Sequence, residues 1–208
     1  MRITVAFTGA SGMAYGVRLV ECLVRAQCEV ALVYSQAAQI VARQECDLLL
    51  PAQPREATRQ LSERFRARPG QLEVYGRDDW MAPMASGSNP GDGMVICPCT
   101  VGALGAIANG LADNLIERAA DVMLKERRTL VLVPRETPLS CIHLDNMATL
   151  ARAGAVILPP APGFYSLPQT IGDLVDFIVA RILDQLHVPH DLGRRWGESD
   201  LPPPTLSV

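Results

Sequence analysis

The N-terminal stretch of the chain, a short apolar run that ends in a glycine-rich turn, constrains the fold more than any other part. Ile3, Val5 and Phe7 lie in residues 2–7, which lead directly into the turn of residues 8–16, and apolar residues then recur at helical spacing. This pattern predicts a strand, a tight turn and a helix. Glycine allows the backbone to approach a ligand closely, and the first N–H groups of a helix attract anions. The turn therefore predicts a phosphate site.

The spacing of this turn is similar to the dinucleotide fingerprint but departs from it. Counted from Gly9, the second glycine position holds Ser11 and the third holds Ala14, and the next apolar run, residues 29–34, ends at Ser35. NAD enzymes place an acidic residue there to bind a ribose hydroxyl. Two hydroxyls at the ends of adjacent strands suit the phosphate of flavin mononucleotide (FMN) better. The alternative is structural, with Ser11 a turn residue and Ser35 an N-cap.

Length and composition bound the class of protein. The chain has 208 residues, of which 49% are hydrophobic, so it can bury a substantial core. We expect one domain over residues 1–187, followed by an arm over residues 188–208 that packs on a neighbouring subunit, with isolated Trp196 as its anchor. The net charge of −3 gives no reason to expect nucleic acid or an anionic membrane as partner. Without a signal peptide or a membrane-spanning run, a cytoplasmic location is predicted.

The cysteines do not form a metal or disulfide pattern. Six cysteines are scattered through apolar stretches, no Cys-x-x-Cys pair is present, and only three histidines are available as further ligands. This composition argues against a zinc site or a disulfide framework. The local cluster Cys97-Pro98-Cys99 is interpreted as small buried residues at a strand end, with redox or metal chemistry as the alternative.

Predicted helices and strands alternate along the rest of the chain. Helices are expected at about residues 35–46, 55–66, 101–109, 115–127, 138–152 and 170–186, and strands at 71–75, 94–97, 129–133 and 155–158, with a long loop at 78–93. Such alternation predicts an α/β fold, a Rossmann-like (flavodoxin-like) three-layer sandwich with a mostly parallel sheet. Ligands of these folds bind at the carboxyl ends of the strands.

Several polar residues are expected at that edge of the sheet. Arg135 and Glu136 follow the predicted strand at 129–133, and Thr100 follows the one at 94–97. Glu45 ends a mostly apolar helical stripe, and a solvated helix end is its alternative interpretation.

Two further cations, Lys125 and Arg181, lie in predicted helices. Lys125 has an ordinary explanation, an ion pair with Asp121 four residues earlier. Arg181 is predicted on the apolar face of its helix, where a cation needs an anion. Either the Asp184 carboxylate, three residues later, or an external phosphate could be the anion that pairs with Arg181.

Five sequence blocks in order carry a resemblance to one family. Residues 8–12, 114–122, 124–128, 133–138 and 159–165 resemble the UbiX-type flavin prenyltransferases, and the likeness covers residues 3–187 and extends to Arg195 and Trp196. Thr100 stands where serine is frequent in the family, and Cys46 stands where threonine is frequent.

The resemblance implies a Rossmann-like flavoprotein that assembles as a dodecamer with active sites between subunits. Dimethylallyl phosphate would alkylate reduced FMN at N5 and then at C6, and the prenylated FMN would serve a UbiD-type decarboxylase as cofactor. By the family pattern, FMN would be held by Gly9, Ala10, Ser11, Ser35, Thr100, Val101, Gly102, Ala103 and Arg135, with Trp196 capping the site. The prenyl phosphate would be held by Lys125, Arg135, Tyr165 and Arg181, and the catalytic roles would fall to Ser11, Glu45 and Glu136.

The chemistry is compatible with a site that uses no metal. Departure of an allylic phosphate builds negative charge on oxygen, which cations must stabilise. Prenyltransferases on helical scaffolds use Mg²⁺ bound to an Asp-Asp-x-x-Asp run, whereas the run at residues 78–82 lacks the final acid. Lys125, Arg135 and Arg181 would replace the metal, because guanidinium groups bind two phosphate oxygens at once. Glu45 could accept the proton released from the flavin.

Three other functions remain open at this point. The chain could be an FMN carrier associated with a decarboxylase but without transferase activity, or it could decarboxylate an aromatic acid by itself. A related class of flavoproteins decarboxylates cysteine-derived substrates with a histidine base. The histidines of this chain, His143, His187 and His190, all lie late in the sequence, which weakens that third alternative.

Overall fold

A computed structural model describes residues 1–193 and shows a single parallel sheet between two layers of helices. The six strands lie in the order β3-β2-β1-β4-β5-β6. The strands are β1 (Arg2–Phe7), β2 (Glu29–Tyr34), β3 (Leu72–Tyr75), β4 (Gly93–Cys99), β5 (Thr129–Pro134) and β6 (Val156–Ile157). Every strand pair is parallel. The predicted α/β fold class is confirmed.

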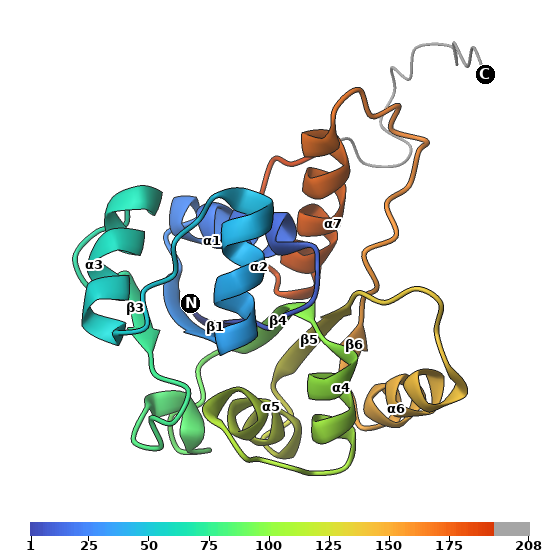
Figure 1. Cartoon of the computed structure of the whole chain (residues 1–208), viewed down its shortest axis with the longest axis horizontal. Coiled ribbons are helices and arrows are strands. Elements are labelled where there is room, and N and C mark those ends of the chain that lie inside the picture. Colours follow the sequence, from blue (N-terminus) through green and yellow to red (C-terminus); the bar gives the residue numbers. More distant parts are fainter. Residues whose placement is uncertain (194–208) are drawn as a thin grey trace.

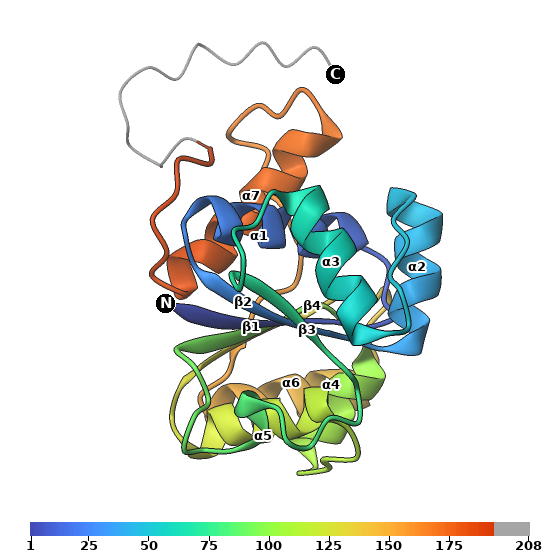
Figure 2. The same ribbon diagram turned by 90° about the vertical axis from the view of Figure 1, so that its left-hand side faces the viewer.

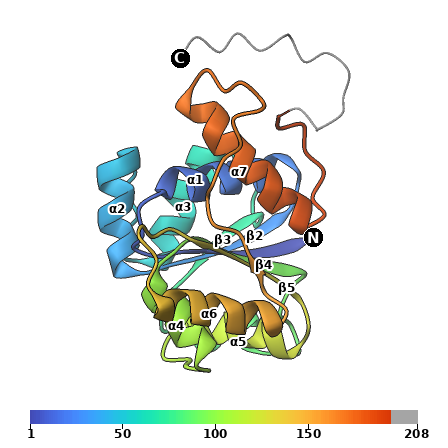
Figure 3. The ribbon, with the colours of Figure 1, turned by 90° about the vertical axis from the view of Figure 1, so that its right-hand side faces the viewer.

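Helices cover both faces of the sheet (Figures 1 and 2). The helices are α1 (Met13–Arg25), α2 (Gln36–Cys46), α3 (Pro54–Phe65), α4 (Val101–Ala108), α5 (Leu115–Lys125), α6 (Cys141–Arg152) and α7 (Ile171–Gln185). In Figure 2, α1, α2, α3 and α7 lie above the sheet and α4, α5 and α6 lie below it. Figure 3 shows that α7 crosses the face of α1.

Strand β1 shows why the apolar runs form central strands. Ile3, Val5 and Phe7 pack into the core cluster beneath α1 and α7, and Ala6 packs into the cluster on the other face. Alternate residues of a strand point to opposite faces, so a strand buried on both sides is mostly apolar on both. These residues are at most 1% exposed.

The first turn of α6 lies later than the sequence predicts. The pattern predicts a helix from residue 138, whereas α6 begins at Cys141. Ser140 is the N-cap, with its side chain accepting the His143 N–H at 3.2 Å, and the His143 ring accepts the Ser140 N–H at the same distance. A capping box of this kind sets the start of a helix.

The long loop between β3 and β4 is anchored to α5. It contains a short 3₁₀ helix, Pro83–Ala85, and Met84 is only 2% exposed. The Arg118 Nε donates to the Ala85 carbonyl at 3.0 Å. The loop is therefore packed at its centre, while Trp80 and Met81 remain exposed.

The six cysteines, all of which lie within the described residues, are free thiols. Cys97 and Cys99 are fully buried at the end of β4. Burial raises the pKa of both thiols well above its usual value, so they stay protonated and unreactive. Among residues 1–193, no group of three or more His, Cys, Asp and Glu side chains could hold a metal ion.

The segment after α7 begins by packing on its own subunit. Val188 is 3% exposed, and the His190 ring lies 3.2 Å from the Asp184 carboxylate. The predicted arm otherwise lies outside the described residues, and so does Trp196. No helix within residues 1–193 is long and apolar enough to cross a membrane.

Candidate functional site

Thr8 joins the ends of β1 and β4 at the carboxyl edge of the sheet. Its hydroxyl donates to the Pro98 carbonyl and accepts the Thr100 N–H, both at 2.8 Å, and the side chain is only 4% exposed. These bonds hold the glycine turn beside the start of α4. Sequence reasoning missed this role, although a hydroxyl residue directly before a glycine turn could have indicated it.

A cavity of about 230 Å³ opens between these two turns. The Ser35 hydroxyl caps α2 by accepting the Ala38 N–H, and the Thr100 hydroxyl caps α4 by accepting the Ala103 N–H, each at 3.1 Å. The cavity is lined by Thr8, Gly9, Ser35, Ala37, Arg77, Thr100, Ala103, Asn114, Ile116 and Glu117. The structure thus brings Ser35 and Thr100 together, and the N-cap interpretation of Ser35 is also confirmed.

This cavity fits a phosphate ester. Each helix start carries a partial positive charge and unpaired N–H groups, and two such starts meet here. Glycine at position 9 lets the first turn lie close against α2, since a Cβ atom at this position would lie 2.4 Å from the Ala37 Cβ. Arg77 adds a full positive charge to the lining. The donor set is therefore that of an anion site.

The N-terminus of α1 already holds an anion from the chain itself. One oxygen of the Glu45 carboxylate accepts the N–H groups of Gly12 and Met13 at 2.9 and 2.8 Å. Gly12, the N-cap, has a φ of 104°, a conformation that favours glycine. The prediction that these N–H groups face a ligand phosphate is therefore wrong, because α2 delivers its last carboxylate to them. Glu45 is also not merely a solvated helix end.

The surroundings of Glu45 keep it ionised. Partial burial alone would raise its pKa, but hydrogen bonds from the Ser11 hydroxyl and the two backbone N–H groups, with the positive charge of Arg135, outweigh that effect. The pKa is consequently lowered from its ordinary value of 4.5. Ser11, Glu45 and Arg135, three of the predicted site residues, therefore form one cluster.

Arg135 and Glu136 follow β5 at the same edge, as predicted. The Arg135 N–H donates to the Cys99 carbonyl at 3.3 Å, which holds the start of this segment against the end of β4. The Arg135 Nε is buried and has no hydrogen-bond partner among the described residues. Such a donor is costly to leave unpaired, so a ligand oxygen would satisfy it. A Glu136 carboxylate oxygen accepts the Thr137 N–H at 3.0 Å.

Lys125 lies at the opposite edge of the sheet within one subunit. Helix α5 runs antiparallel to the strands, so its last residue lies near the amino ends, beside Gly87 in the loop before β4. A helix of 11 residues rises about 16 Å, so Lys125 lies about that far from the start of α5, which is held at the carboxyl edge by the bond from the Leu115 N–H to the Arg77 carbonyl. The expected ion pair with Asp121 is also absent from the described ion pairs. Lys125 pairs with Glu126, and Asp121 pairs with Arg118 at 2.9 Å.

Arg181 is not on the buried face of α7, so that prediction is wrong. Its side chain is 53% exposed and pairs with Asp184 at 2.8 Å. The buried stripe runs through Ile178, Val179, Ile182 and Leu183. Leu174 and Phe177, the neighbours used for the prediction, are themselves only partly buried.

Tyr165 packs next to this surface. Its ring meets Phe177 edge to face, with 5.7 Å between ring centroids, and it is 44% exposed. The structure thus pairs Tyr165 with α7. Of the remaining predicted flavin residues, Ala10 is buried in the first turn, and Val101 and Gly102 begin α4.

Comparison with known proteins places the chain in a family. The Flavoprotein family model matches residues 1–183. A flavin prenyltransferase UbiX from Pseudomonas aeruginosa is 58% identical over 200 residues, which cover 96% of each chain. The chain belongs to the UbiX family of flavin prenyltransferases. The resemblance seen in the five sequence blocks is thereby confirmed.

Solved structures of UbiX-type proteins share the whole fold. A dodecameric protein from Escherichia coli O157:H7, described as an FMN-dependent UbiX-like decarboxylase, aligns with a TM-score of 0.83 and 41% identity over 94% of this chain and 99% of that one. AnUbiX (PadA1), solved in complex with FMN and dimethylallyl pyrophosphate, gives a TM-score of 0.82 and 43% identity over 96% of this chain and 98% of that one. The first description names a decarboxylase, whereas the second names the bound ligands and no activity.

Proposed function

We propose that this chain is a flavin prenyltransferase that transfers a dimethylallyl group from dimethylallyl phosphate to N5 and C6 of reduced FMN. The observation that carries this proposal is the position of the Ser11, Glu45 and Arg135 cluster beside a phosphate-sized cavity at one sheet edge. The UbiX relatives, one of which was solved with FMN and a dimethylallyl ester, support it.

The flavin phosphate would bind in the cavity between α2 and α4. Ser35, Thr100 and the N–H groups of residues 101–103 would hold its oxygens, because both helix starts favour negative charge. The backbone of Gly9 and Ala10 would support the flavin, and Arg135 would donate its unpaired Nε to it. Reduced FMN would supply the electron-rich nitrogen and carbon.

Ser11 and Glu45 would remove the proton released by the flavin. The lowered pKa keeps the Glu45 carboxylate ionised, so it can act as the final proton acceptor. The Ser11 hydroxyl, which hydrogen-bonds Glu45, would pass its proton to the carboxylate as it accepts one from the flavin. Glu136, next to Arg135 at the end of β5, would complete the polar edge.

The donor phosphate would be held by more than one subunit. Lys125 lies near the amino ends of the strands and Arg135 follows β5 at the carboxyl edge, so Lys125 of a neighbouring subunit would complete the site. The exposed side chains of Tyr165 and Arg181 would contribute across the same interface. Large exposed apolar side chains, with Phe164 at 70% and Ile171 at 80%, lie close to Tyr165 and the start of α7 and suit such an interface. We therefore propose a homo-oligomer, a dodecamer as described for the Escherichia coli relative.

The product would be prenylated FMN for a UbiD-type decarboxylase. The reaction produces a modified flavin but does not use that product. Another enzyme must therefore use the prenylated flavin as its cofactor. We place both reactions in the cytoplasm, because FMN and the prenyl donor are charged phosphate esters that do not cross a membrane unaided.

The test is anaerobic incubation of the protein with reduced FMN and dimethylallyl phosphate. Mass spectrometry should find a flavin heavier by the C₅H₈ that a dimethylallyl group adds when it replaces one hydrogen, and free phosphate should appear in equal amount. An unchanged flavin that remains bound would instead indicate an FMN carrier.

Direct decarboxylation is the second candidate, since the Escherichia coli relative is described as a decarboxylase. Aromatic acids incubated with the FMN-loaded protein alone would then release carbon dioxide without any partner enzyme. We expect none, because the carboxylate of this site is bound at the start of α1 and kept ionised there.

A further inference from the structure

Arg77 is the only cation that lines the cavity between α2 and α4 in the described chain. It follows β3 by two residues and was not singled out from the sequence. The other ionisable side chain in the lining is Glu117, whose carboxylate accepts the Asp113 N–H at 2.9 Å.

The backbone at Arg77 is anchored while its side chain is unengaged. The Arg77 carbonyl accepts the Leu115 N–H at 2.7 Å, which joins the end of β3 to the first residue of α5. Within residues 1–193, the guanidinium makes no ion pair or hydrogen bond. A side-chain substitution would therefore leave this backbone contact in place.

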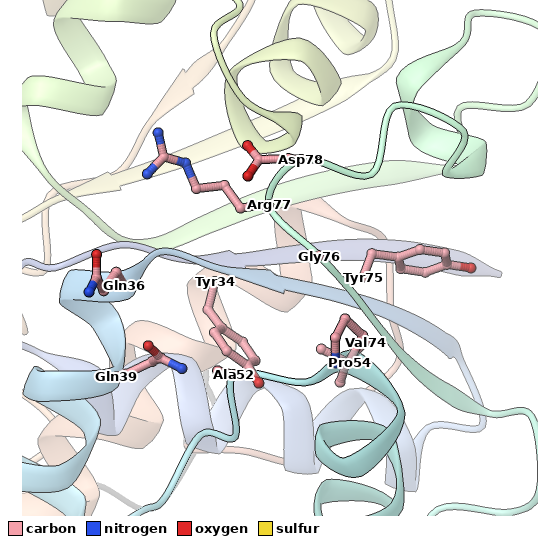
Figure 4. A pocket seen from close by; sticks show the side chains of 10 residues that line it. All are labelled: Tyr34, Gln36, Gln39, Ala52, Pro54, Val74, Tyr75, Gly76, Arg77 and Asp78. Carbon is pink, nitrogen blue, oxygen red and sulfur yellow. The ribbon is translucent and has the colours of Figure 1, made fainter.

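Two polar side chains that line a second pocket beside Arg77, those of Tyr34 and Gln39, are already paired. This pocket, of about 240 Å³, is shown in Figure 4, where the Arg77 side chain points away from Tyr34 and Gln39. The Tyr34 hydroxyl donates to the Pro51 carbonyl at 2.5 Å and the Gln39 amide donates to the Leu50 carbonyl at 2.9 Å. Those two side chains hold the loop before α3, and Arg77 is the cation among the residues that line this pocket.

A flavin phosphate in the cavity would need such a cation. The two helix starts supply partial charges only, about half an elementary charge each, while a phosphate monoester carries close to two negative charges. The Glu117 carboxylate in the same lining adds a further negative charge. A guanidinium offsets this repulsion and binds two phosphate oxygens in a fixed geometry.

We propose that the Arg77 guanidinium binds the terminal phosphate of FMN and makes the site selective for the phosphorylated flavin over riboflavin. This inference rests on the proposed function, since it places the FMN phosphate between Ser35 and Thr100. It adds a binding residue to those that the family resemblance assigns.

The test compares two flavins that differ only in the phosphate. Dissociation constants for FMN and riboflavin are measured by flavin fluorescence on the full-length protein, without prenyl donor, for the parent and Arg77→Ala. Loss of one charge-assisted phosphate contact should weaken FMN binding about tenfold to hundredfold. Riboflavin binding should change by about twofold or less. The salt dependence of FMN binding should also become shallower.

Two further variants keep the result interpretable. Arg77→Lys retains the charge and should recover part of the FMN affinity. Arg152→Ala removes an equal charge from the last turn of α6, at the opposite edge of the sheet, and should bind both flavins like the parent. Equal weakening of both flavins by Arg77→Ala, or unchanged FMN affinity, would overturn the proposal. Because no turnover is measured, this outcome is independent of whether the protein transfers a prenyl group.

Discussion

Replacing Glu45 with glutamine tests the two roles of the carboxylate that lies at the start of α1. Glutamine is isosteric, and its amide oxygen can still accept the Gly12 and Met13 N–H groups that lie 2.9 and 2.8 Å from the carboxylate. The substitution therefore removes the charge and the proton-accepting group while it keeps the local packing. Ser35 and Thr100 are untouched, so FMN should remain bound.

The expected loss of stability is small. A negative charge at an exposed helix N-terminus contributes about 0.3–1 kcal/mol. For a chain of 150–250 residues, 1 kcal/mol corresponds to roughly 2–4 °C in Tm. The pH dependence follows from the lowered pKa of Glu45 in the folded protein. The stabilisation is complete above the ordinary pKa of 4.5 and is lost as the pH falls through the lower folded value, because a protonated Glu45 is also neutral.

The expected loss of activity is much larger. Removing a proton acceptor costs about 10²- to 10⁴-fold in rate. A stability loss of about 1 kcal/mol leaves almost all molecules folded, so it cannot account for such a change. The rate of prenylated FMN formation is measured by single-turnover absorbance under anaerobic conditions, and Tm is measured at pH 7 and at pH 3.

Glu63→Gln is the matched control. Glu63 is a well-exposed carboxylate near the end of α3, 3.9 Å from Arg59, and its neutralisation should alter neither quantity. If Glu45→Gln turns over like the parent, the proposed proton transfer is wrong. If its lower Tm persists unchanged at pH 3, the charge at the start of α1 is not the source of the stabilisation.

The remaining predictions concern the donor, the first turn and metal. Arg181→Ala should raise KM for dimethylallyl phosphate about tenfold or more. It should change the free energy of unfolding by about 1 kcal/mol or less, because exposed ion pairs such as that with Asp184 contribute little. An unchanged KM would remove Arg181 from the site. Gly9→Ala brings a methyl group to 2.4 Å from the Ala37 Cβ, and such overpacking should cost about 1–3 kcal/mol in chemical denaturation and weaken FMN binding. Gly172→Ala, where the nearest atom is 3.4 Å away, serves as its control. EDTA should leave prenyl transfer unchanged, and a loss restored by Mg²⁺ would show that the cations do not replace a metal.

Local patterns in the sequence were enough to predict the sheet and its binding edge. Strand β1, the glycine turn and α1 follow from the order of apolar and glycine residues within the first 25 positions. Ser35 and Thr100 could be placed at one edge because the carboxyl ends of parallel strands meet there. The other predicted site residues came from the family resemblance. One of them, Trp196, lies outside the described residues and stays a prediction.

The contacts between distant side chains could not be predicted in this way. Glu45 reaches the start of α1 from 33 positions along the chain, and only the packing of α2 against α1 brings them together. The exposed position of Arg181 depends on how α7 is rotated against α1, since apolar residues occupy both its buried face and the partly buried face of Leu174 and Phe177.

The sequence by itself therefore determined the class of fold and the family, and it predicted the carboxyl edge of the sheet for the candidate site. Periodicity and turn residues act over a few positions, and they encode those properties directly. Only the tertiary structure decided which anion caps α1, that Lys125 lies at the far edge of its own subunit, and that Arg77 enters the cavity. Electrostatic interactions and hydrogen bonds depend on distance in space, and that distance is set by helix packing.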